Sequence, residues 1–411
     1  MKIKSKFYML LFILLPIWIS IFSFQPNLST IPYSNPSISA PAYGTSNFNI
    51  TQSVKYQVEI NFTLTNNVGG ANCYFKWPRL NNRVPSSPLT QYTPPYQNSE
   101  LLYNNITGFN PTELNMGHND KFNNTYDSFN ATLAPTEKIT LSQKYNVTLN
   151  AIKFQNIEDS DIGIYNMSDV IFDLYCNNTE PYYERDDLSL ISLSNSIVLP
   201  SDNQVEKAEK INNWVSQNIV YDNSGPAQEM GALWAYNNLK GDCSEYSSLM
   251  ITLLRIQNIP ARKVTGFLIS NNPSIRPQVN KTYEFHVSES ESNLLGHAWV
   301  EYYVPDIGWI ACDPTWSSAT NYFNRIDFLR FTRNIGANFF FPPSSIDSEF
   351  NTIYRASGGS CSFDYDIKIT VLETQLAPLS SIPLLFFVFI GIGIAAVVLT
   401  VFLIARGRQN K

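Results

Sequence analysis

The stretch that decides the fold is Gly241-Asp242-Cys243-Ser244-Glu245-Tyr246, because it places a cysteine where a helix should begin. Asp242 is a favourable N-cap residue, and Glu245 follows at the spacing of a capping box. We therefore expect a helix from Cys243 to Gln257 with the cysteine at its first position. There the helix dipole favours a thiolate and the free amides could receive an oxyanion, although the charges of Asp242 and Glu245 oppose the thiolate.

Two further motifs decide whether Cys243 is reactive or an inert buried residue, which is the alternative. They are Gly296-His297-Ala298-Trp299 and Asp313-Pro314-Thr315. The chain has only three histidines, and those at positions 118 and 286 fall in a β-rich region and a polar stretch. His297 is thus the candidate base for the thiol. The Asp-Pro pair is also a typical strand-ending turn, and the two roles are compatible.

A hairpin should bring His297 and Asp313 together. The strand that starts at His297 places alternate residues on one face, and a second strand follows from Trp309 to Asp313. A five-residue loop, Val304 to Gly308, pairs Tyr303 with Trp309 and makes His297 and Asp313 diagonal neighbours within side-chain reach. A four-residue loop would put them on opposite faces. The register is therefore a test of the proposed triad.

These motifs resemble the core of the transglutaminase-like superfamily. The resemblance also includes Leu253 to Phe267 (LLRIQNIPARKVTGF), and it covers roughly residues 200 to 330. It implies a papain-like α+β core in which Cys243 is the nucleophile, His297 the base and acid, and Asp313 the orienting residue. The family acts on amides as cross-linking transferases, peptidases or peptide-N-glycanases, and some members are inactive. The oxyanion-binding indole of animal transglutaminases and the zinc-binding cysteines of eukaryotic glycanases have no match here.

The first part of the chain predicts an antiparallel β-sandwich-like domain. Apolar residues alternate without a miss from Val54 to Leu64, and Ile139, Leu141, Tyr145, Val147 and Leu149 repeat the alternation. A helical pattern follows from Val205 to Ile219, and Ser270 to Asn293 is either a rim over the site or a disordered surface insertion. The predicted organisation is 1–24 signal or anchor, 25–45 linker, 46–180 β-sandwich-like domain, 200–345 catalytic domain, 361–373 juxtamembrane strand, 382–405 transmembrane helix and 406–411 cytoplasmic tail.

Both ends of the chain are apolar. Three early lysines precede the run Phe7 to Phe24, which is typical of an export signal, cleaved or kept as an anchor. Ile382 to Ala405 is long enough to cross the ~30 Å hydrocarbon layer, and its lack of a polar face argues against the alternative of a buried core helix. Basic residues follow it directly, so the positive-inside rule places the tail in the cytoplasm and the middle of the chain outside.

Glycosylation sequons and cysteines fit an extracellular location. Ten Asn-x-Ser/Thr sequons occur, at positions 27, 49, 61, 105, 123, 130, 146, 166, 177 and 280. Five cysteines imply at least one unpaired thiol in a single chain. If Cys243 is unpaired, Cys73 with Cys176 is a candidate disulfide.

The sequence therefore predicts an extracellular, membrane-anchored thiol enzyme that acts on peptide or side-chain amides of proteins at the cell surface. Water as the acceptor makes it a peptidase, an amine makes it an acyltransferase, and hydrolysis is slightly favoured because it needs no second-substrate tunnel. The alternative is a non-catalytic adhesion protein that uses the domain as a scaffold. The net charge of −6 and the lack of a basic run argue against nucleic-acid binding. There is no Gly-rich phosphate loop, and no cofactor and no metal-ligating residues are assigned.

Overall fold

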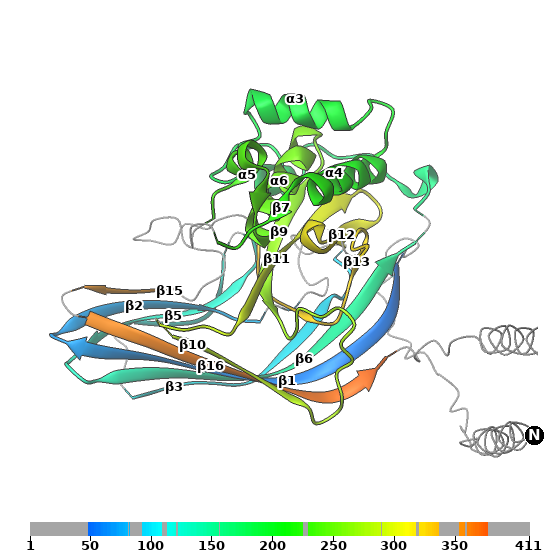
Figure 1. The fold of residues 1–411 in the computed structure, drawn as a ribbon. Coiled ribbons are helices and arrows are strands. Elements are labelled where there is room, and N and C mark those ends of the chain that lie inside the picture. Colours follow the sequence, from blue (N-terminus) through cyan, green and yellow to red (C-terminus); the bar gives the residue numbers. More distant parts are fainter. Residues whose placement is uncertain are drawn as a thin grey trace, which may run out of the picture. The chain divides into compact units, whose positions relative to one another are not determined.

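The computed structural model describes residues 48–80, 82, 93–108, 113–120, 122–155, 157–224, 229–288, 290–317, 320–336, 353–357 and 360–376. All of these lie within one compact unit, Tyr43–Lys411. In this described part the fold is built from three antiparallel sheets, one short parallel pair of strands and a group of helices (Figure 1). The mixture of strand and helix agrees with the predicted α+β class.

The largest sheet, here called the long sheet, forms around the strand predicted from alternation. Along β1 (Phe48–Val68), the inward residues from Val54 to Leu64 are at most 2% exposed. β1 pairs antiparallel with β6 (Lys138–Phe154), the second strand that alternation predicted. The sheet order is β10-β16-β1-β6-β13, with β3 also beside β6. The remaining bounds are β3 Gln97–Gly108, β10 Thr282–Ser288, β13 Arg325–Ile326 and β16 Ser360–Gln375.

A second sheet, here called the facing sheet, packs against the long sheet to complete a sandwich. Its order is β15-β2-β5-β4, with bounds β15 Ile353–Ser357, β2 Ala71–Pro78, β5 Thr125–Leu133 and β4 Glu113–Asn119. Aromatic side chains join the two sheets, and the rings of Phe62 and Trp77 lie 5.3 Å apart. Residues of both sheets share one apolar core, which is what makes the two layers a stable sandwich.

Two strands of the long sheet come from parts of the sequence not expected there. The strand anticipated at 361–373 is present as β16, but it lies in the middle of the sheet between β1 and β10. Strand β10 comes from the stretch Ser270 to Asn293, so part of this stretch is ordered in the sheet and is neither a rim nor a disordered insertion. Alternation predicts that a segment is a strand, but the partner of a strand so distant in sequence depends on the complete fold.

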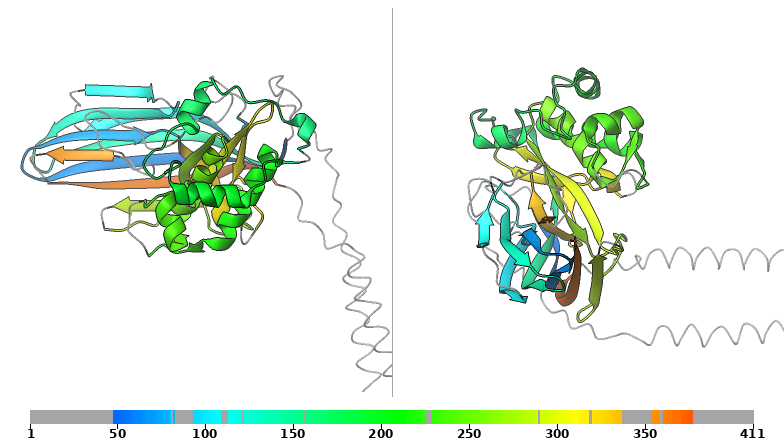
Figure 2. Two further views of the ribbon diagram at one scale, coloured as in Figure 1. Left: turned by 90° about the horizontal axis from the view of Figure 1, so that it is seen from above. Right: turned by 90° about the vertical axis from the view of Figure 1, so that its left-hand side faces the viewer.

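The third sheet, here called the core sheet, carries the candidate site. Its order is β12-β11-β9-β14, with bounds β12 Gly308–Cys312, β11 Leu295–Val304, β9 Ala261–Leu268 and β14 Arg330–Ile335. Helix α6 (Cys243–Ile256) packs on β11 and β9, and its residues from Cys243 to Arg255 are all buried. The other helices gather on the same side, as Figure 2 shows from two directions: α3 Leu188–Ile197, α4 Gln204–Asn218, α5 Ala232–Asn238 and α7 Pro314–Ser317.

The segment from 157 to 180 belongs to the helical side of the molecule, whereas the sequence analysis placed it with the sandwich. It contains η2 (Asp159–Asp161) and α2 (Val170–Tyr175). The buried face of α2 joins the core around α6 and β12, and the ring of Tyr175 lies edge-on to Trp309 at 5.2 Å. The sandwich strands of this region therefore end with β6. The apolar residues of α2 that follow pack in the core beside the core sheet.

Strands β9 and β14 join the core sheet to the sandwich. Phe267 and Phe331 stack at 5.0 Å, and both lie in the sandwich core. Gly266, the neighbour of Phe267 on β9, lies very close to β14. A Cβ atom at this position would be 1.7 Å from the carbonyl oxygen of Phe331. Glycine is therefore required by the close approach of two strands.

Several expectations concern residues outside the described part. The N-terminal apolar run and the predicted transmembrane helix both lie there, as do the linker and the cytoplasmic tail. Among the described helices, none has both the length and the apolar character needed to cross a membrane.

The suggested pairing of Cys73 with Cys176 is wrong. The sulfur of Cys73 lies 3.3 Å from that of Cys361, while Cys176 lies in the other apolar core with its sulfur 3.8 Å from the carbonyl oxygen of Arg255. That prediction assumed that both cysteines belong to the first domain. α2 instead carries the chain into the helical core, away from the sandwich.

Candidate active site

Helix α6 begins at Cys243, as the capping pattern predicts. The Asp242 carboxylate accepts from the amide of Ser244 at 2.7 Å, and the amide of Asp242 donates to Glu245 at 3.0 Å. Both halves of the capping box are thus present. The parallel pair β7 (Val220–Tyr221) and β8 (Lys240–Gly241) holds the chain just before this start. The cysteine is fixed at the first helical position and is 7% exposed.

The hairpin of β11 and β12 has the predicted register. Tyr303 pairs with Trp309, and the ladder continues to Val300 opposite Cys312. The ladder also includes Val304 opposite Gly308, so the unpaired loop is shorter than expected while the register is the same. In this register Nε2 of His297 and Oδ2 of Asp313 are 2.7 Å apart.

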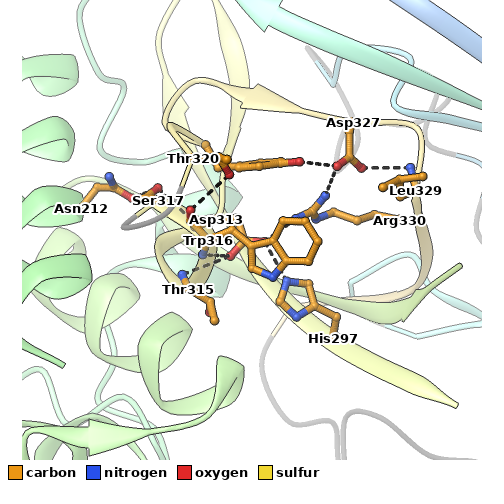
Figure 3. A network of polar contacts seen from close by, with 11 residues as sticks. Asn212, His297, Asp313, Thr315, Trp316, Ser317, Thr320, Asp327, Leu329 and Arg330 are labelled. Carbon is orange, nitrogen blue, oxygen red and sulfur yellow. Dashed lines mark hydrogen bonds and ion pairs between the residues drawn. The ribbon is translucent and has the colours of Figure 1, made fainter. Parts of the chain in front are cut away.

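Asp313 is a buried carboxylate surrounded by donors (Figure 3). Its Oδ2 accepts from His297 and, at 2.8 Å, from Arg330, and its Oδ1 accepts from the amides of Thr315 and Trp316 at 3.1 and 3.3 Å. Burial raises the pKa of Asp313, but the charges of His297 and Arg330 and the hydrogen bonds from both outweigh it and lower this pKa to about 2. Asp313 is therefore ionised at physiological pH and can orient the imidazole and stabilise its charged form.

Arg330 is a residue of the site that sequence reasoning missed. Its side chain is 0% exposed and bridges Asp313 at 2.8 Å and Asp327 at 2.5 Å. Trp316 and Tyr322 each stack on its guanidinium at 4.5 Å. Burial lowers the pKa of Arg330, but the charges of Asp327 and Asp313 raise it above the usual value, so the group is a permanent cation. It sits in β14, where the sequence showed only a mixed, aromatic-rich stretch without a motif.

Two indoles flank the imidazole of His297. The ring of Trp299 stacks on it at 6.2 Å. The ring of Trp316 lies 6.0 Å from it, as Figure 3 shows for these two side chains. His297 is 4% exposed. Since Nε2 is bonded to Asp313, Nδ1 is the ring nitrogen that remains to exchange a proton with a substrate or a thiol.

The thiol of Cys243 adjoins the same strand, because the backbone amide of Ala298 is among the groups that lower its pKa. No direct hydrogen bond joins Cys243 to His297, both of which are described residues. Burial and the charge of Asp242 raise the pKa of the Cys243 thiol, although the Ala298 amide and the Lys263 charge oppose this. The thiol is therefore protonated at rest, and its activation requires a base.

Lys263 supplies a buried positive charge near the thiol, and the sequence analysis assigned no role to it although it lies in the stretch Leu253 to Phe267. It is 0% exposed and forms an ion pair with Glu229. It also donates to the hydroxyl of Ser248 at 2.9 Å, which places this pair against the inner face of α6. The negative charge of Glu229 offsets the positive charge of Lys263. The pair therefore does little to stabilise a thiolate on Cys243, which agrees with a thiol that stays neutral.

The capping geometry narrows the choice of oxyanion donors. Asp242 accepts from the amides of Ser244 and Glu245, so these two are already engaged. The amide of Cys243 is the first-turn donor that the cap leaves aside. When the thiol attacks an amide, the oxyanion on the substrate's carbonyl oxygen would therefore accept a hydrogen bond from the Cys243 amide and not from the other amides of the first turn.

Tyr221 is an aromatic residue beside the thiol that the sequence analysis did not select. It ends β7 opposite Gly241, and it is 55% exposed. Partial burial and the charges of Cys243 and Asp242 raise the pKa of Tyr221 to about 12. It therefore presents a neutral hydroxyl and a half-exposed ring close to Cys243.

The other two histidines lie elsewhere. His286 is on β10, and its Nδ1 lies 2.9 Å from Asp366 of β16. Position 118 is on the backbone of β4 in the facing sheet. His286 takes no part in the hydrogen bond between His297 and Asp313.

Comparison with known proteins gives the class of this domain. Residues 191–314 match the model of the transglutaminase-like superfamily, a range that contains Cys243, His297 and Asp313. An uncharacterized Bacillus subtilis protein, YebA, is 27% identical over 120 residues, which are 28% of this chain and 16% of that protein. A protein-glutamine gamma-glutamyltransferase of Pseudomonas aeruginosa is 33% identical over 86 residues, 20% of this chain and 11% of that protein. The matched segments are thus under a fifth of those relatives.

The fold extends beyond this domain in one solved structure. A Cytophaga hutchinsonii protein named provisionally as a cysteine protease superposes with a TM-score of 0.51 at 15% identity, covering 81% of this chain and 96% of that one. That likeness concerns the fold alone. Residues 191–314 thus match a transglutaminase-like superfamily domain.

Proposed function

We propose that this protein is a thiol enzyme that cleaves or exchanges peptide or side-chain amide bonds through an acyl-enzyme on Cys243. The observation that carries the proposal is the buried His297–Asp313 pair, whose Nε2 and Oδ2 atoms are 2.7 Å apart. His297 lies on β11, and the Ala298 amide of this strand lowers the pKa of the Cys243 thiol. A nucleophile next to a base that is itself oriented by a carboxylate is the arrangement that nucleophilic catalysis requires.

The reaction follows from the protonation states of these groups. Because the Cys243 thiol is neutral at rest, His297 takes its proton on Nδ1 as the sulfur attacks the amide carbon. Asp313, ionised and bonded to Nε2, stabilises the imidazolium that forms. The amide of Cys243 is placed to receive the oxyanion. His297 then gives the proton to the leaving amine, and a thioester on Cys243 remains for the acceptor.

Labelling with an electrophilic peptide probe tests the proposal. We expect the wild-type chain to label, and Cys243→Ala and His297→Ala not to label. The matched controls are Cys312→Ala, a buried cysteine next to Asp313, and His286→Gln. If wild type labels no better than Cys243→Ala, the domain is a scaffold and the chain is a binding or adhesion protein.

The acceptor can be water or an amine. The catalytic groups are enclosed, with Cys243, His297 and Asp313 at most 7% exposed, and exclusion of water is what transfer to an amine needs. The glutamyltransferase relative supports transfer, and the name of the Cytophaga protein supports hydrolysis. Incorporation of a labelled amine into glutamine peptides, compared with the release of free acid, decides between them.

We propose that the enzyme acts outside the cell, on surface proteins or peptides, tethered through the apolar segments at both ends of the chain. Nine of the ten sequon asparagines lie in the described part, and none of them is buried, so each site could carry a glycan. A shift in mass after enzymatic removal of N-glycans, together with fractionation into membranes that resists salt washing, would support this location. Recovery of the unmodified chain in the soluble fraction would contradict it.

A further inference from the structure

Two cysteines outside the active site face each other between the sheets of the sandwich. The sulfurs of Cys73 on β2 and Cys361 on β16 are 3.3 Å apart. The residues are 2% and 8% exposed. β2 belongs to the facing sheet and β16 to the long sheet, so a bond between these sulfurs would join the two layers.

The backbone fixes this contact. In the facing sheet Cys73 lies opposite Ala356 of β15, and in the long sheet Cys361 lies opposite Asn66 of β1. The chain therefore crosses from one sheet to the other between β15 and β16, and Cys361 comes directly after this crossing. These two registers and the 3.3 Å between the sulfurs show that the two cysteines face each other between the sheets.

The remaining cysteines have no such neighbour. All five lie in the described part, and none is bridged in the structure. The sulfur of Cys176 contacts the carbonyl oxygen of Arg255, that of Cys312 lies 3.9 Å from the Met250 sulfur, and Cys243 is in the candidate active site. One pair out of five cysteines is thus placed for bonding, and three thiols are left.

We propose that Cys73 and Cys361 form a disulfide when the chain folds in an oxidising compartment. The step is thiol–disulfide exchange with a small disulfide or a disulfide oxidoreductase. Each thiol loses one proton, the sulfur–sulfur bond of the oxidant breaks, and its two sulfurs leave as thiols while the bond between Cys73 and Cys361 forms. The two cysteines are oxidised by two electrons and the oxidant is reduced by two.

The bond would fix the strand that leads out of the fold. β16 lies between β1 and β10, and the chain beyond it runs to the C-terminal apolar segment. The cross-link joins residues 288 positions apart, and closing a long loop restricts the unfolded chain strongly. Burial and the neighbouring Cys361 raise the pKa of Cys73 to about 12, so exchange in the folded protein is slow. Such a disulfide is structural, not a redox switch.

Thiol counting on the full chain, exported by its expression host and purified without reductant, tests the proposal. In denaturant we expect three titratable thiols without reductant and five with it. Trypsin, after removal of N-glycans because Asn61 lies in the first peptide, should release residues 56–76 linked to residues 356–368. Five thiols without reductant, or a link to any other cysteine, would overturn the proposal.

Substitutions provide an independent readout. Cys73→Ala and Cys361→Ala should each lower the Tm by roughly 5–15 °C, and the double variant should lose no more than either single one, since all three lack the same bond. Cys176→Ala is the matched buried control, which should keep the linked peptide and reduce the thiol count by one. Additive losses in the double variant would show two independently packed thiols and refute the disulfide.

Discussion

Replacing Asp313 by asparagine should nearly abolish acylation while keeping the shape of the site. Each carboxylate oxygen faces two donors: His297 and Arg330 on one side, and the amides of Thr315 and Trp316 on the other. Whichever way the new amide turns, its NH₂ group meets two donors and one side of the network is lost. If the NH₂ faces His297, the imidazole is held as the tautomer that cannot accept the thiol proton.

The size of the effect follows from the charge that is removed. Lowering the pKa of Asp313 from 3.8 to about 2 corresponds to roughly 2–3 kcal/mol of extra stabilisation of its charged form in the folded protein. Loss of the carboxylate from a comparable triad lowers the rate by about 10⁴. We therefore expect acylation to slow by about 10³–10⁴, which is a barrier increase of ~4–5.5 kcal/mol.

The assay needs no knowledge of the natural substrate. A burst of nitrophenolate from p-nitrophenyl acetate measures acylation of the thiol, and circular dichroism melts show whether each variant is folded at the assay temperature. Asp364→Asn, an exposed aspartate on β16, is the matched control. A folded Asp313→Asn protein that acylates within threefold of wild type would refute the role of this carboxylate.

Three further predictions concern stability. Arg330→Met should cost about 3–5 kcal/mol in urea unfolding, because it leaves buried carboxylates unpaired, and unchanged stability would contradict the bridge. Gly266→Ala should destabilise by more than ~3 kcal/mol because of the Phe331 carbonyl, whereas Gly70→Ala, with nothing within 4 Å, should be nearly neutral; equal effects would exclude the close approach as the cause. The stabilisation from Asp313 should be complete above about pH 4 and disappear as the pH falls towards 2, because its folded pKa is the lower one, and melts of Asp313→Asn should lack this acid-dependent loss.

Local sequence signals predicted the start of α6 and the geometry that brings His297 to Asp313. The capping box set the start of α6, and the strand pattern around Pro305 to Gly308 set the hairpin register that joins His297 to Asp313. Both are short-range features, in which side-chain chemistry and turn length determine the geometry within a few residues.

The features that could not be predicted depend on distant partners. Arg330 reaches Asp313 only because β14 pairs with β9, and its sequence surroundings carry no sign of a buried ion pair. In the same way, no local signal predicted that β10 and β16 pair with each other in the long sheet. The contact between Cys73 and Cys361 depends on how the two sheets of the sandwich pack. The pKa of Cys243 was also open, because burial outweighs the helix dipole only once the thiol is enclosed.

Locating the acyl group tests the central claim most directly. After reaction with p-nitrophenyl acetate and a brief tryptic digestion near neutral pH, we expect a hydroxylamine-sensitive acetyl group on residues 241–255, a peptide whose only cysteine is Cys243. It should be absent from His297→Ala and present at wild-type level in Cys312→Ala. Acetylation of other peptides alone, or equal acetylation of residues 241–255 in wild type and His297→Ala, would contradict a nucleophile activated by this imidazole.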